Sequence, residues 1–319
     1  MTRYGHGLVP GRFLPPHAGH HHLVRTARDR CERLTVLVRP SAADTLPLED
    51  RVAWMREIHP DVLVVGGEEY AGPERVDAVF TADPDGDEPG RRLGAETVPL
   101  DRAIPLTGAA VREDPAAFWD FFEPPVRAAL TRRVVVLGAE STGATTMARA
   151  LTDHYRRRGG VWARTRCVPD HAGEYRALRP AEPLRSSDFP VIAQRQSELE
   201  EAAARDGSPV LFCDADAFAA TIRHERHTGT ASPATCEIAA HGRRHLWLLT
   251  DHRGIDRADD TDRLRPWMTA RLLTQLAHTG RRTAVLTGPH EERLAAAVAA
   301  VDGLLAEGRH LTEPLPELR

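Results

Sequence analysis

The sequence predicts an α/β protein with two doubly wound parallel sheets, one after the other along the chain. Short β-rich runs alternate with helical patterns throughout, and a glycine-rich turn follows the first such run in each half. The length of 319 residues also exceeds what a single hydrophobic core usually organises. We therefore expect two domains, residues 1–130 and residues 131–319.

The first half has a βαβαβ order. A short strand at 7–10 runs into the first glycine turn, and strands are also expected at 34–38 and 61–65. Helical patterns cover 19–30 and 48–58, between these strands. Because each strand is followed by a helix that returns the chain, the order implies parallel strands. The polar stretch 82–90 is expected to be a loop, 118–125 a hinge, and 126–130 a short helix before the second domain.

The second half repeats this pattern. A β-rich run at 133–137 leads into the second glycine turn, and a helix follows at 147–155. The later apolar runs predict strands at 210–213, 245–249 and 283–286, and the helical patterns lie near 188–205, 216–227, 262–278 and 290–306.

Composition narrows the class of protein. Net charge is −4, so no basic field suggests nucleic acid as a partner. No apolar run approaches the roughly 18 to 20 residues that a membrane span needs, and no signal region precedes the first motif. The 4 cysteines share no metal-ligand spacing. We expect a cytoplasmic protein without a membrane partner, and a homo-oligomer is compatible with the sequence.

The first glycine turn ends in a pair of histidines. It reads Gly-Arg-Phe-Leu-Pro-Pro-His-Ala-Gly-His over 11–20, with Gly19 between His17 and His20. Near the start of a helix, backbone N–H groups already favour anions, and two imidazoles add hydrogen-bond donors for phosphate. A bare histidine run, which continues with His21 and His22, would also fit an adventitious metal site. The complete string favours phosphate chemistry.

The second glycine turn is a P-loop without its lysine. It reads Gly-Ala-Glu-Ser-Thr-Gly-Ala-Thr over 138–145, and Ala144 stands where the lysine belongs. In a P-loop the backbone amides hold phosphates, the lysine bridges the β- and γ-phosphates, and the last hydroxyl binds Mg²⁺. All 42 basic residues of this chain are arginine. The motif therefore predicts a nucleotide cradle with Thr145 toward Mg²⁺, contacted by Gly138, Glu140, Ser141, Thr142, Gly143, Ala144 and Thr146.

The first string resembles the nucleotidyltransferase superfamily, whose members join a nucleotide to a phosphorylated small molecule. The segment 106–115 resembles that family's C-terminal motif, with Thr107 at its serine, Ala109 in place of its threonine and Arg112 at its arginine. The resemblance implies catalytic roles for His17, His20 and Arg112, with ATP contacts from Gly11, Arg12, Phe13, Gly19 and Thr107. The segments around Trp54 and Tyr70 resemble those near a nicotinamide pocket, although packing in the core explains both residues equally well.

The second half resembles ribosylnicotinamide kinases. The segment 188–196 is similar to their D-F-P-x-I-A-x-x-Q, and 259–263 to their D-D-x-x-R. Phe-Cys-Asp-Ala-Asp over 212–216 resembles their strand-end D-T-D, with Ala215 in place of the threonine. The resemblance implies that Asp214 is the base or Mg²⁺ ligand and that Arg263 contacts phosphate. It implies substrate contacts from Asp216, Glu174, Tyr175 and Gln194.

Together, residues 5–308 resemble the bifunctional nicotinamide-nucleotide adenylyltransferase/ribosylnicotinamide kinase (NadR-like) family. The resemblance implies a Rossmann-like nucleotidyltransferase followed by a P-loop kinase-like domain. It implies Mg²⁺ as cofactor and three substrates: ATP, nicotinamide mononucleotide and nicotinamide riboside. The DNA-binding domain of some relatives is expected to be absent, because the first strand starts close to Met1.

Three alternatives stay open at this point. Ala109, Ala144 and Ala215 favour an adenylyltransferase whose P-loop domain binds nucleotide without turnover. The acceptor is another phosphorylated molecule in the second alternative, and the third is a nucleotide sensor without activity. If the kinase works, an arginine replaces the lysine; Arg149 is a poor candidate on helical geometry, whereas Arg263 and Arg265 are better ones.

Overall fold

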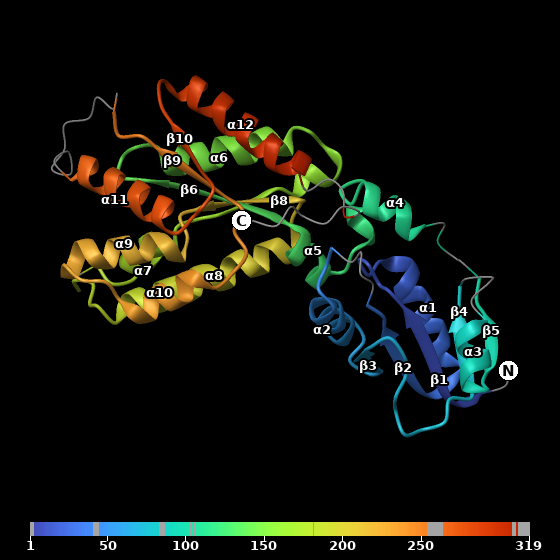
Figure 1. Ribbon diagram of the computed structural model, residues 1–319. Helices are drawn as coiled ribbons and strands as arrows, with labels where there is room; N and C mark the ends of the chain where they lie inside the picture. The colour runs from blue at the N-terminus through green and yellow to red at the C-terminus, as the bar shows by residue number, and fades with distance from the viewer. Residues whose placement is uncertain are drawn as a thin grey trace. The chain divides into compact units, whose positions relative to one another are not determined.

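The computed structural model describes residues 3–40, 45–82, 87–101, 104, 106–180, 182–253, 264–307 and 311. The chain forms two compact units (Figure 1). The first comprises Met1–Val126 with Gly308–Arg319, and the second comprises Arg127–Glu307. The sequence predicts a boundary after residue 130 and places the end of the chain in the second domain, so the two divisions differ at both points.

The first unit contains a five-stranded sheet in the order β3-β2-β1-β4-β5. All four neighbouring pairs are parallel. Its strands are β1 (Tyr4–Gly11), β2 (Cys31–Val38), β3 (Leu63–Gly66), β4 (Ala78–Thr81) and β5 (Glu96–Pro99). Its helices are α1 (Ala18–Asp29), α2 (Leu48–Ile58), α3 (Glu88–Leu93) and α4 (Gly108–Glu113), and a 3₁₀ turn spans Trp119–Phe121.

Helices α1 and α2 cover one face of this sheet. Alternate residues of each strand point to the same side, so Val9, Val36 and Val64 share a core with Val24 of α1 and Met55 of α2. Both crossovers, β1 to β2 and β2 to β3, step in the same direction along the sheet, which places their helices on one face. The glycine turn between β1 and α1 thus opens at the carboxyl edge of the sheet.

The second unit contains the sheet β10-β9-β6-β8-β7, again parallel throughout. The fold class predicted from the sequence is confirmed. The strands are β6 (Arg132–Gly138), β7 (Arg166–Val168), β8 (Val210–Asp214), β9 (Leu246–Thr250) and β10 (Thr283–Leu286). The helices are α5 (Pro124–Leu130), which begins in the first unit, α6 (Ala144–Arg156), α7 (His171–Ala177), α8 (Asp188–Asp206), α9 (Ala217–Thr228), α10 (Pro233–Ala240), α11 (Arg265–His278) and α12 (His290–Glu307), with a 3₁₀ turn at Gly160–Arg164.

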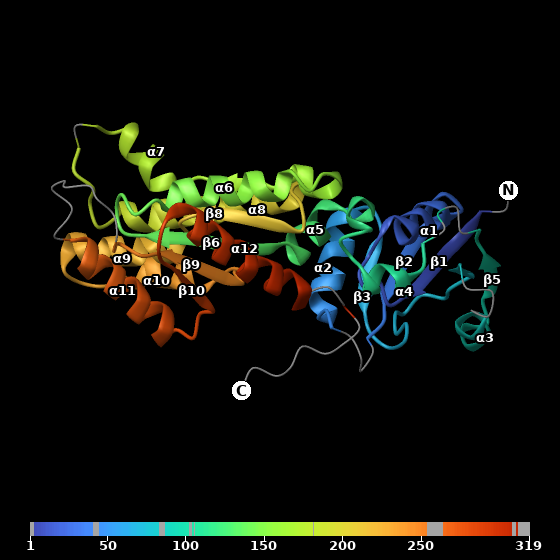
Figure 2. The same ribbon diagram turned by 90° about the horizontal axis from the view of Figure 1, so that it is seen from above.

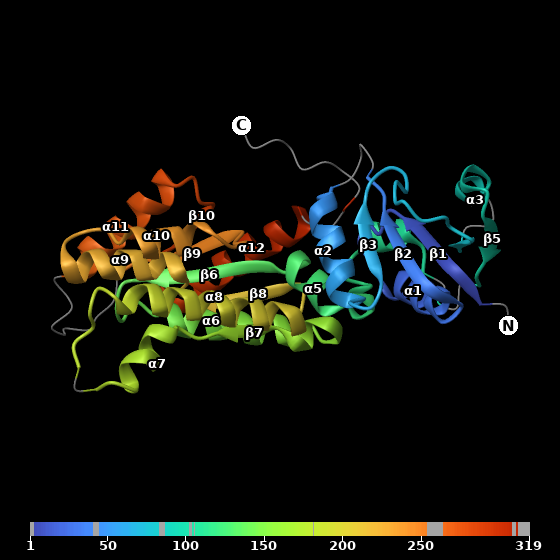
Figure 3. The same ribbon diagram turned by 90° about the horizontal axis from the view of Figure 1, so that it is seen from below.

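Helices cover both faces of this second sheet. Helices α6 and α12 lie on one side, while α8, α9 and α10 pack together on the other (Figures 1 and 2). Figure 3 shows α9, α10 and α11 from below. Strand β6 contributes side chains to a hydrophobic core on each face of the sheet. Val134 and Val136 pack with α6, whereas Val135 and Leu137 pack with α9 and α11. A strand buried on both faces is expected to be apolar throughout, as 133–137 nearly is.

The structure corrects the predicted elements in a few places. The stretch 82–90 was predicted to be a loop throughout, but α3 begins at Glu88 with a proline in its first turn, a position that proline tolerates. Trp119, in the predicted hinge, is fully buried against Phe122. Helix α6 begins at Ala144, directly after the P-loop glycine and three residues earlier than predicted.

A short contact holds part of the chain's C-terminal region in the first unit. The backbone N–H of Leu311 donates to the carbonyl of Arg112 at 2.8 Å. The hydroxyl of Thr45 donates to the carbonyl of Leu311 at 2.7 Å. Leu311 therefore bridges the loop before α2 and helix α4.

Candidate active sites

The first glycine turn is held in a strained conformation. Phe13 has φ 49°, in the left-handed region that a bulky side chain seldom adopts, and it is 1% exposed. Its ring contacts the His20 ring edge-on, with centroids 5.1 Å apart. Strain of this kind persists only where surrounding packing fixes it, and it concentrates at functional sites.

His17 and His20 lie side by side at the start of α1. Their ring centroids are 3.7 Å apart, and His17 is 4% exposed. Gly19 leaves room for this arrangement, since a Cβ there would lie 3.2 Å from the His17 ring. Within the described part of the chain, both ring nitrogens of His17 and Nδ1 of His20 are buried without a hydrogen-bond partner. Buried polar atoms without partners are costly, so these nitrogens suit a polar ligand.

Burial keeps both histidines neutral. Together with the charge of Arg112, burial lowers the pKa of His17 to about 4. Burial also lowers the pKa of His20 well below its usual value, with the neighbouring His17 contributing. Neutral imidazoles each donate one hydrogen bond, and a bound phosphate would favour their protonation.

The two nucleotidyltransferase-like motifs meet at one cavity of about 310 Å³. His17 and His20 line it from one side, and Thr107 and Gly108 from another. Thr107 also caps α4, because its hydroxyl accepts the N–H of Ala110 at 3.2 Å. The cavity is further lined by Pro10, Gly11, Phe13, Gly19, His22, Leu23, Thr81, Ala82, Asp101, Ile104 and Leu106.

A buried arginine from the segment around Trp54 holds the turn in place. Arg51 on α2 is 1% exposed and donates to the carbonyls of Arg12, Arg39 and Leu46, the last two at 3.0 and 3.2 Å. Its signal in the sequence was weak, since one charged residue in an amphipathic helix normally faces water. Arg51 therefore ties the phosphate turn to the end of β2 and the start of α2.

Of the other two histidines of the run, His22 also lines the cavity and His21 does not. His21 is buried, and its Nδ1 lies 3.0 Å from Nε2 of His59, while His22 is exposed. In the described residues, no group of three His, Cys, Asp or Glu side chains is placed to hold a metal. The run is therefore divided between the cavity, the core and the surface.

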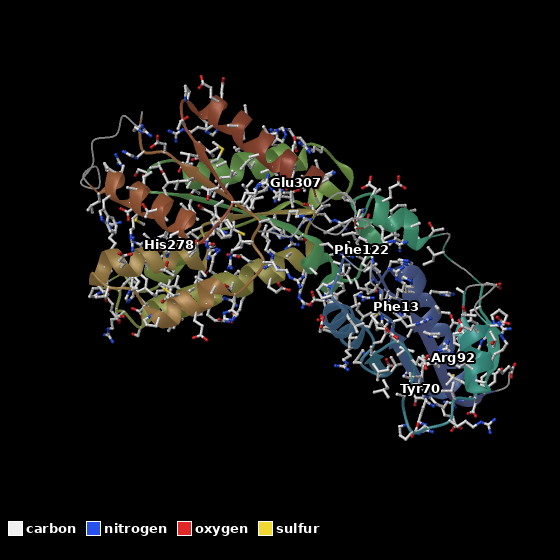
Figure 4. All side chains as sticks on the ribbon, in the orientation of Figure 1. Phe13, Tyr70, Arg92, Phe122, His278 and Glu307 are labelled. Atoms are coloured by element: carbon white, nitrogen blue, oxygen red, sulfur yellow. The ribbon has the colours of Figure 1, made fainter. Side chains whose placement is uncertain are left out.

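Trp54 and Tyr70 stay predictions as substrate contacts. Trp54 is buried on α2, and Tyr70 packs edge-on against His6 at 5.7 Å. Neither lines the His17 cavity among the described residues. Figure 4 shows Tyr70 near Arg92, away from Phe13, and both Tyr70 and Arg92 line a second, smaller cavity.

The second glycine turn has the backbone of a P-loop. Ser141 has φ 64° and Gly143 has φ 89°. The Thr142 hydroxyl donates to the carbonyl of Ala139 at 2.7 Å and pairs with the Thr250 hydroxyl at 2.7 Å. A Cβ on Gly138 would lie about 2 Å from both hydroxyls, so only glycine fits there. Thus the cradle is intact around Ala144.

Asp214 lies at the end of β8, opposite the P-loop. Its carboxylate accepts a hydrogen bond from Thr145, and burial raises its pKa. It is 7% exposed, and Asp170 nearby also raises its pKa. A hydroxyl paired with a carboxylate at the end of a P-loop is the oxygen pair that Mg²⁺ prefers, so Thr145 and Asp214 fit that ion.

Arginines from three helices surround the second turn. From α9, Arg226 pairs with the Glu140 carboxylate at 2.8 Å. From α11, Arg265 donates through Nε to the Glu140 carbonyl at 3.0 Å. From α12, Arg293 donates to the Thr142 carbonyl at 3.1 Å. Guanidinium groups therefore hold both the backbone and the side chain of the loop.

The other residues predicted to contact substrate or phosphate in the second unit have separate surroundings. The Asp216 carboxylate caps α9 and accepts from the Trp247 indole at 3.2 Å. Tyr175 donates to Asp188 at 2.9 Å, and the exposed Glu174 pairs with His171. Arg263 lies outside the described residues. All these assignments stay predictions.

Gln196, not Gln194, reaches the end of β8. Gln194 is exposed on α8 and donates to Glu198 at 3.2 Å. Gln196 is buried, accepts from the backbone of His171 at 3.0 Å, and lies 3.5 Å from the Ala215 carbonyl. The sequence did hold a signal, because Gln196 occupies the last position of D-F-P-x-I-A-x-x-Q.

None of the helices in the described part of the chain is both long and apolar enough to cross a membrane. Residues 133–293 match a family model described as an AAA domain, and residues 8–72 match one described as cytidylyltransferase-like.

Two curated proteins match in alignments 288 positions long, which cover 77% of this chain and 68% of each of them. Both are named trifunctional NAD biosynthesis/regulator protein NadR. The protein of Escherichia coli K12 is 24% identical, and that of Salmonella typhimurium LT2 is 23% identical.

Two crystal structures share the fold. A NadR protein in complex with NAD and AMP-PNP superposes with a TM-score of 0.72 at 19% identity, covering 95% of this chain and 96% of that one. A NadR protein in complex with NR has a TM-score of 0.73 at 18% identity, covering 100% and 99%. At these identities the likeness shows the fold alone.

Proposed function

The chain belongs to the NadR-like family and carries an AAA domain over residues 133–293, and on this premise we propose that it is a nucleotidyltransferase that makes NAD. It would transfer the adenylyl group of ATP to nicotinamide mononucleotide and release pyrophosphate. The P-loop unit would phosphorylate nicotinamide riboside, the compound we take to be the NR of the related crystal structure.

The observation that carries this proposal is the His17–His20 cavity. Both ring nitrogens of His17 and Nδ1 of His20 are buried, and within the described residues they have no hydrogen-bond partner. They lie where α1 begins, just after the turn that follows β1. Arg112 adds a positive charge close enough to lower the pKa of both histidines. The combination of helix start, imidazoles and guanidinium favours a polyphosphate over an uncharged ligand.

Adenylyl transfer needs positioning rather than a covalent enzyme intermediate. A phosphate oxygen of the mononucleotide attacks the α-phosphorus of ATP and forms a new O–P bond, while the bond from that phosphorus to the bridging β-phosphate oxygen breaks. Pyrophosphate leaves with the electron pair. His17, His20 and Arg112 would stabilise the negative charge that develops on these oxygens.

In the P-loop unit, the 5′-hydroxyl oxygen of the riboside attacks the γ-phosphorus of ATP. Asp214, buried at the end of β8 beside Thr145, would accept the hydroxyl proton. The O–P bond to ADP breaks and ADP leaves. Mg²⁺, when bound, would neutralise phosphate charge, and the Thr145 hydroxyl would be one of its ligands.

A second candidate is an adenylyltransferase with a different phosphorylated acceptor and a P-loop unit that only binds nucleotide. Ala144 in the lysine position favours it, since losing one transition-state donor costs about 100- to 1000-fold in rate. Ala109 and Ala215 each replace a motif hydroxyl as well.

Product analysis by mass spectrometry tests these proposals. The purified protein receives ATP and Mg²⁺, with nicotinamide mononucleotide in one reaction and nicotinamide riboside in another. We expect NAD from both. NAD from the mononucleotide alone would support the second candidate's silent P-loop unit. The absence of NAD from both reactions would overturn the nicotinamide assignment.

A further inference from the structure

A P-loop lysine has two physical tasks, and the second unit must meet both without one. The ammonium group neutralises charge on the β- and γ-phosphates, and a cation at this place also holds the carbonyls of the loop. Ala144 can do neither. With no lysine anywhere in the chain, the substitute cation has to be an arginine from outside the loop.

Arg265 is placed to meet both tasks. It is the first residue of α11, it is 2% exposed, and its Nε donates to the Glu140 carbonyl at 3.0 Å. Arginine stays charged in proteins, and a charge so deeply buried is little screened by water. Its guanidinium is therefore bonded directly to the backbone of the loop that would hold the phosphates.

The neighbouring arginines are engaged in other ways. Arg293 joins the P-loop to two other segments of the second unit. Its nitrogens donate to the carbonyls of Gly288, Thr142 and Arg253 at 2.7 to 3.3 Å. Arg226 offsets the negative charge of Glu140. Arg223 forms a two-pronged pair with Asp170 at 2.7 and 2.9 Å.

We propose that Arg265 takes the place of the P-loop lysine, holding the loop through Glu140 and supplying the positive charge beside the β- and γ-phosphates of ATP. This inference rests on the proposed kinase function of the second unit. Arg226 supports it, because it keeps the Glu140 carboxylate from cancelling that charge. The positive charge would thus reach the phosphates from α11 instead of from the first turn of α6.

The test is a rescue experiment with four full-length proteins: wild type, Arg265→Ala, Ala144→Lys, and both changes together. ADP formation with nicotinamide riboside reports on the second unit, and pyrophosphate release with nicotinamide mononucleotide reports on the first. We expect Arg265→Ala to lower ADP formation about 100- to 1000-fold and leave pyrophosphate release unchanged. Adding Ala144→Lys to Arg265→Ala should restore at least about tenfold, because lysine returns the charge to its usual place.

A matched control is Arg271→Ala on the same helix, which removes a half-exposed arginine paired with Glu225. It should change ADP formation less than about twofold, the scale of a surface ion pair. Arg265→Lys, which keeps the charge, should lose less than Arg265→Ala. The inference is overturned if Arg265→Ala has no effect. It is equally overturned if Ala144→Lys does not restore ADP formation to the Arg265→Ala protein, since Arg265 would then only stabilise the fold of the second unit.

A separate measurement distinguishes failure of this inference from failure of the proposed function. If the wild type forms no ADP from the riboside, the kinase proposal fails, and binding of Mg·ATP by equilibrium dialysis then tests Arg265. We expect two sites per chain in the wild type, one in Arg265→Ala, and two again when Ala144→Lys is added. Two sites of unchanged affinity in Arg265→Ala would overturn the inference.

Discussion

The two phosphate turns occupy equivalent places in their sheets, yet they acquire polar groups differently. Each follows the first strand of its unit and precedes a helix, α1 or α6. The first turn carries its own donors, His17 and His20. The second relies on Arg226, Arg265 and Arg293, which lie more than 80 residues away along the chain. A local motif therefore describes the first site well and the second poorly.

The strongest test of this contrast removes the donors of the first turn. Replacing both His17 and His20 with alanine should lower adenylyl transfer about 10⁴-fold, since each donor is worth about 100-fold or more. Release of pyrophosphate measures this loss, and ADP formation by the second unit should not change. An equal loss of both activities would show that the variant is misfolded.

Asp214→Asn should produce the next largest effect, on the second unit alone. The amide keeps the shape of the side chain but accepts no proton, so ADP formation should fall about 100- to 1000-fold. Asp206→Asn is a matched control, because Asp206 is exposed and pairs with Arg166 at the far end of α8. An unchanged rate in Asp214→Asn would remove Asp214 from the mechanism.

Arg51→Met tests how the first turn is held. The change leaves the carbonyls of Arg12, Arg39 and Leu46 without their buried donor, which should cost about 2 to 3 kcal/mol of unfolding free energy. Urea unfolding followed by adenylyl transfer activity measures the loss. Arg33→Met, at an exposed arginine paired with Glu74, should stay within about 0.5 kcal/mol of wild type.

Mild acid should weaken the first unit. The pKa values of His17 and His21 are lowered to about 4 and about 3, whereas both are about 6.5 in the unfolded chain. Between those values the unfolded state binds the protons, so stability is full above pH 6.5 and falls as pH drops, by about 1.4 kcal/mol per unit for each histidine. Urea midpoints from pH 7 to 5 measure this, and His21→Asn should flatten the slope.

The smallest expected effect is that of Ala144→Lys alone. Because Arg265 already supplies the charge, the added lysine should change ADP formation less than about threefold, which is under about 0.7 kcal/mol. Initial rates with nicotinamide riboside measure it. A rise of about 100-fold would instead describe an impaired kinase and break the contrast between the two turns.

Sequence patterns predicted best the elements in which an apolar pattern lies between clear turn residues. Helix α2 and strand β10 begin and end where expected, since apolar periodicity and turn residues bound both. Strands β5 and β7 were missed, because Glu-Thr-Val-Pro and Arg-Cys-Val contain no apolar run, whereas β10 ends in Ala-Val-Leu. Helix α7, seven residues long, was missed for a similar reason.

For the sites, the sequence predicted the residues that lie within a motif. His17, His20 and Thr107 line one cavity although almost 90 residues separate the two motifs. The contacts of Arg51 and Arg293 depend on how distant segments pack, and neither residue stands out by type in a chain whose basic residues are all arginine. Long-range hydrogen bonds of this kind leave no local pattern to read.

The contact of Leu311 with Arg112 and Thr45 has a consequence for how the protein is made. The first unit includes residues from both sides of the second, so the second is in effect inserted into it. A ribosome releases the chain from its amino end, and the P-loop unit emerges before Leu311 does. The first unit therefore begins to form first and is completed last.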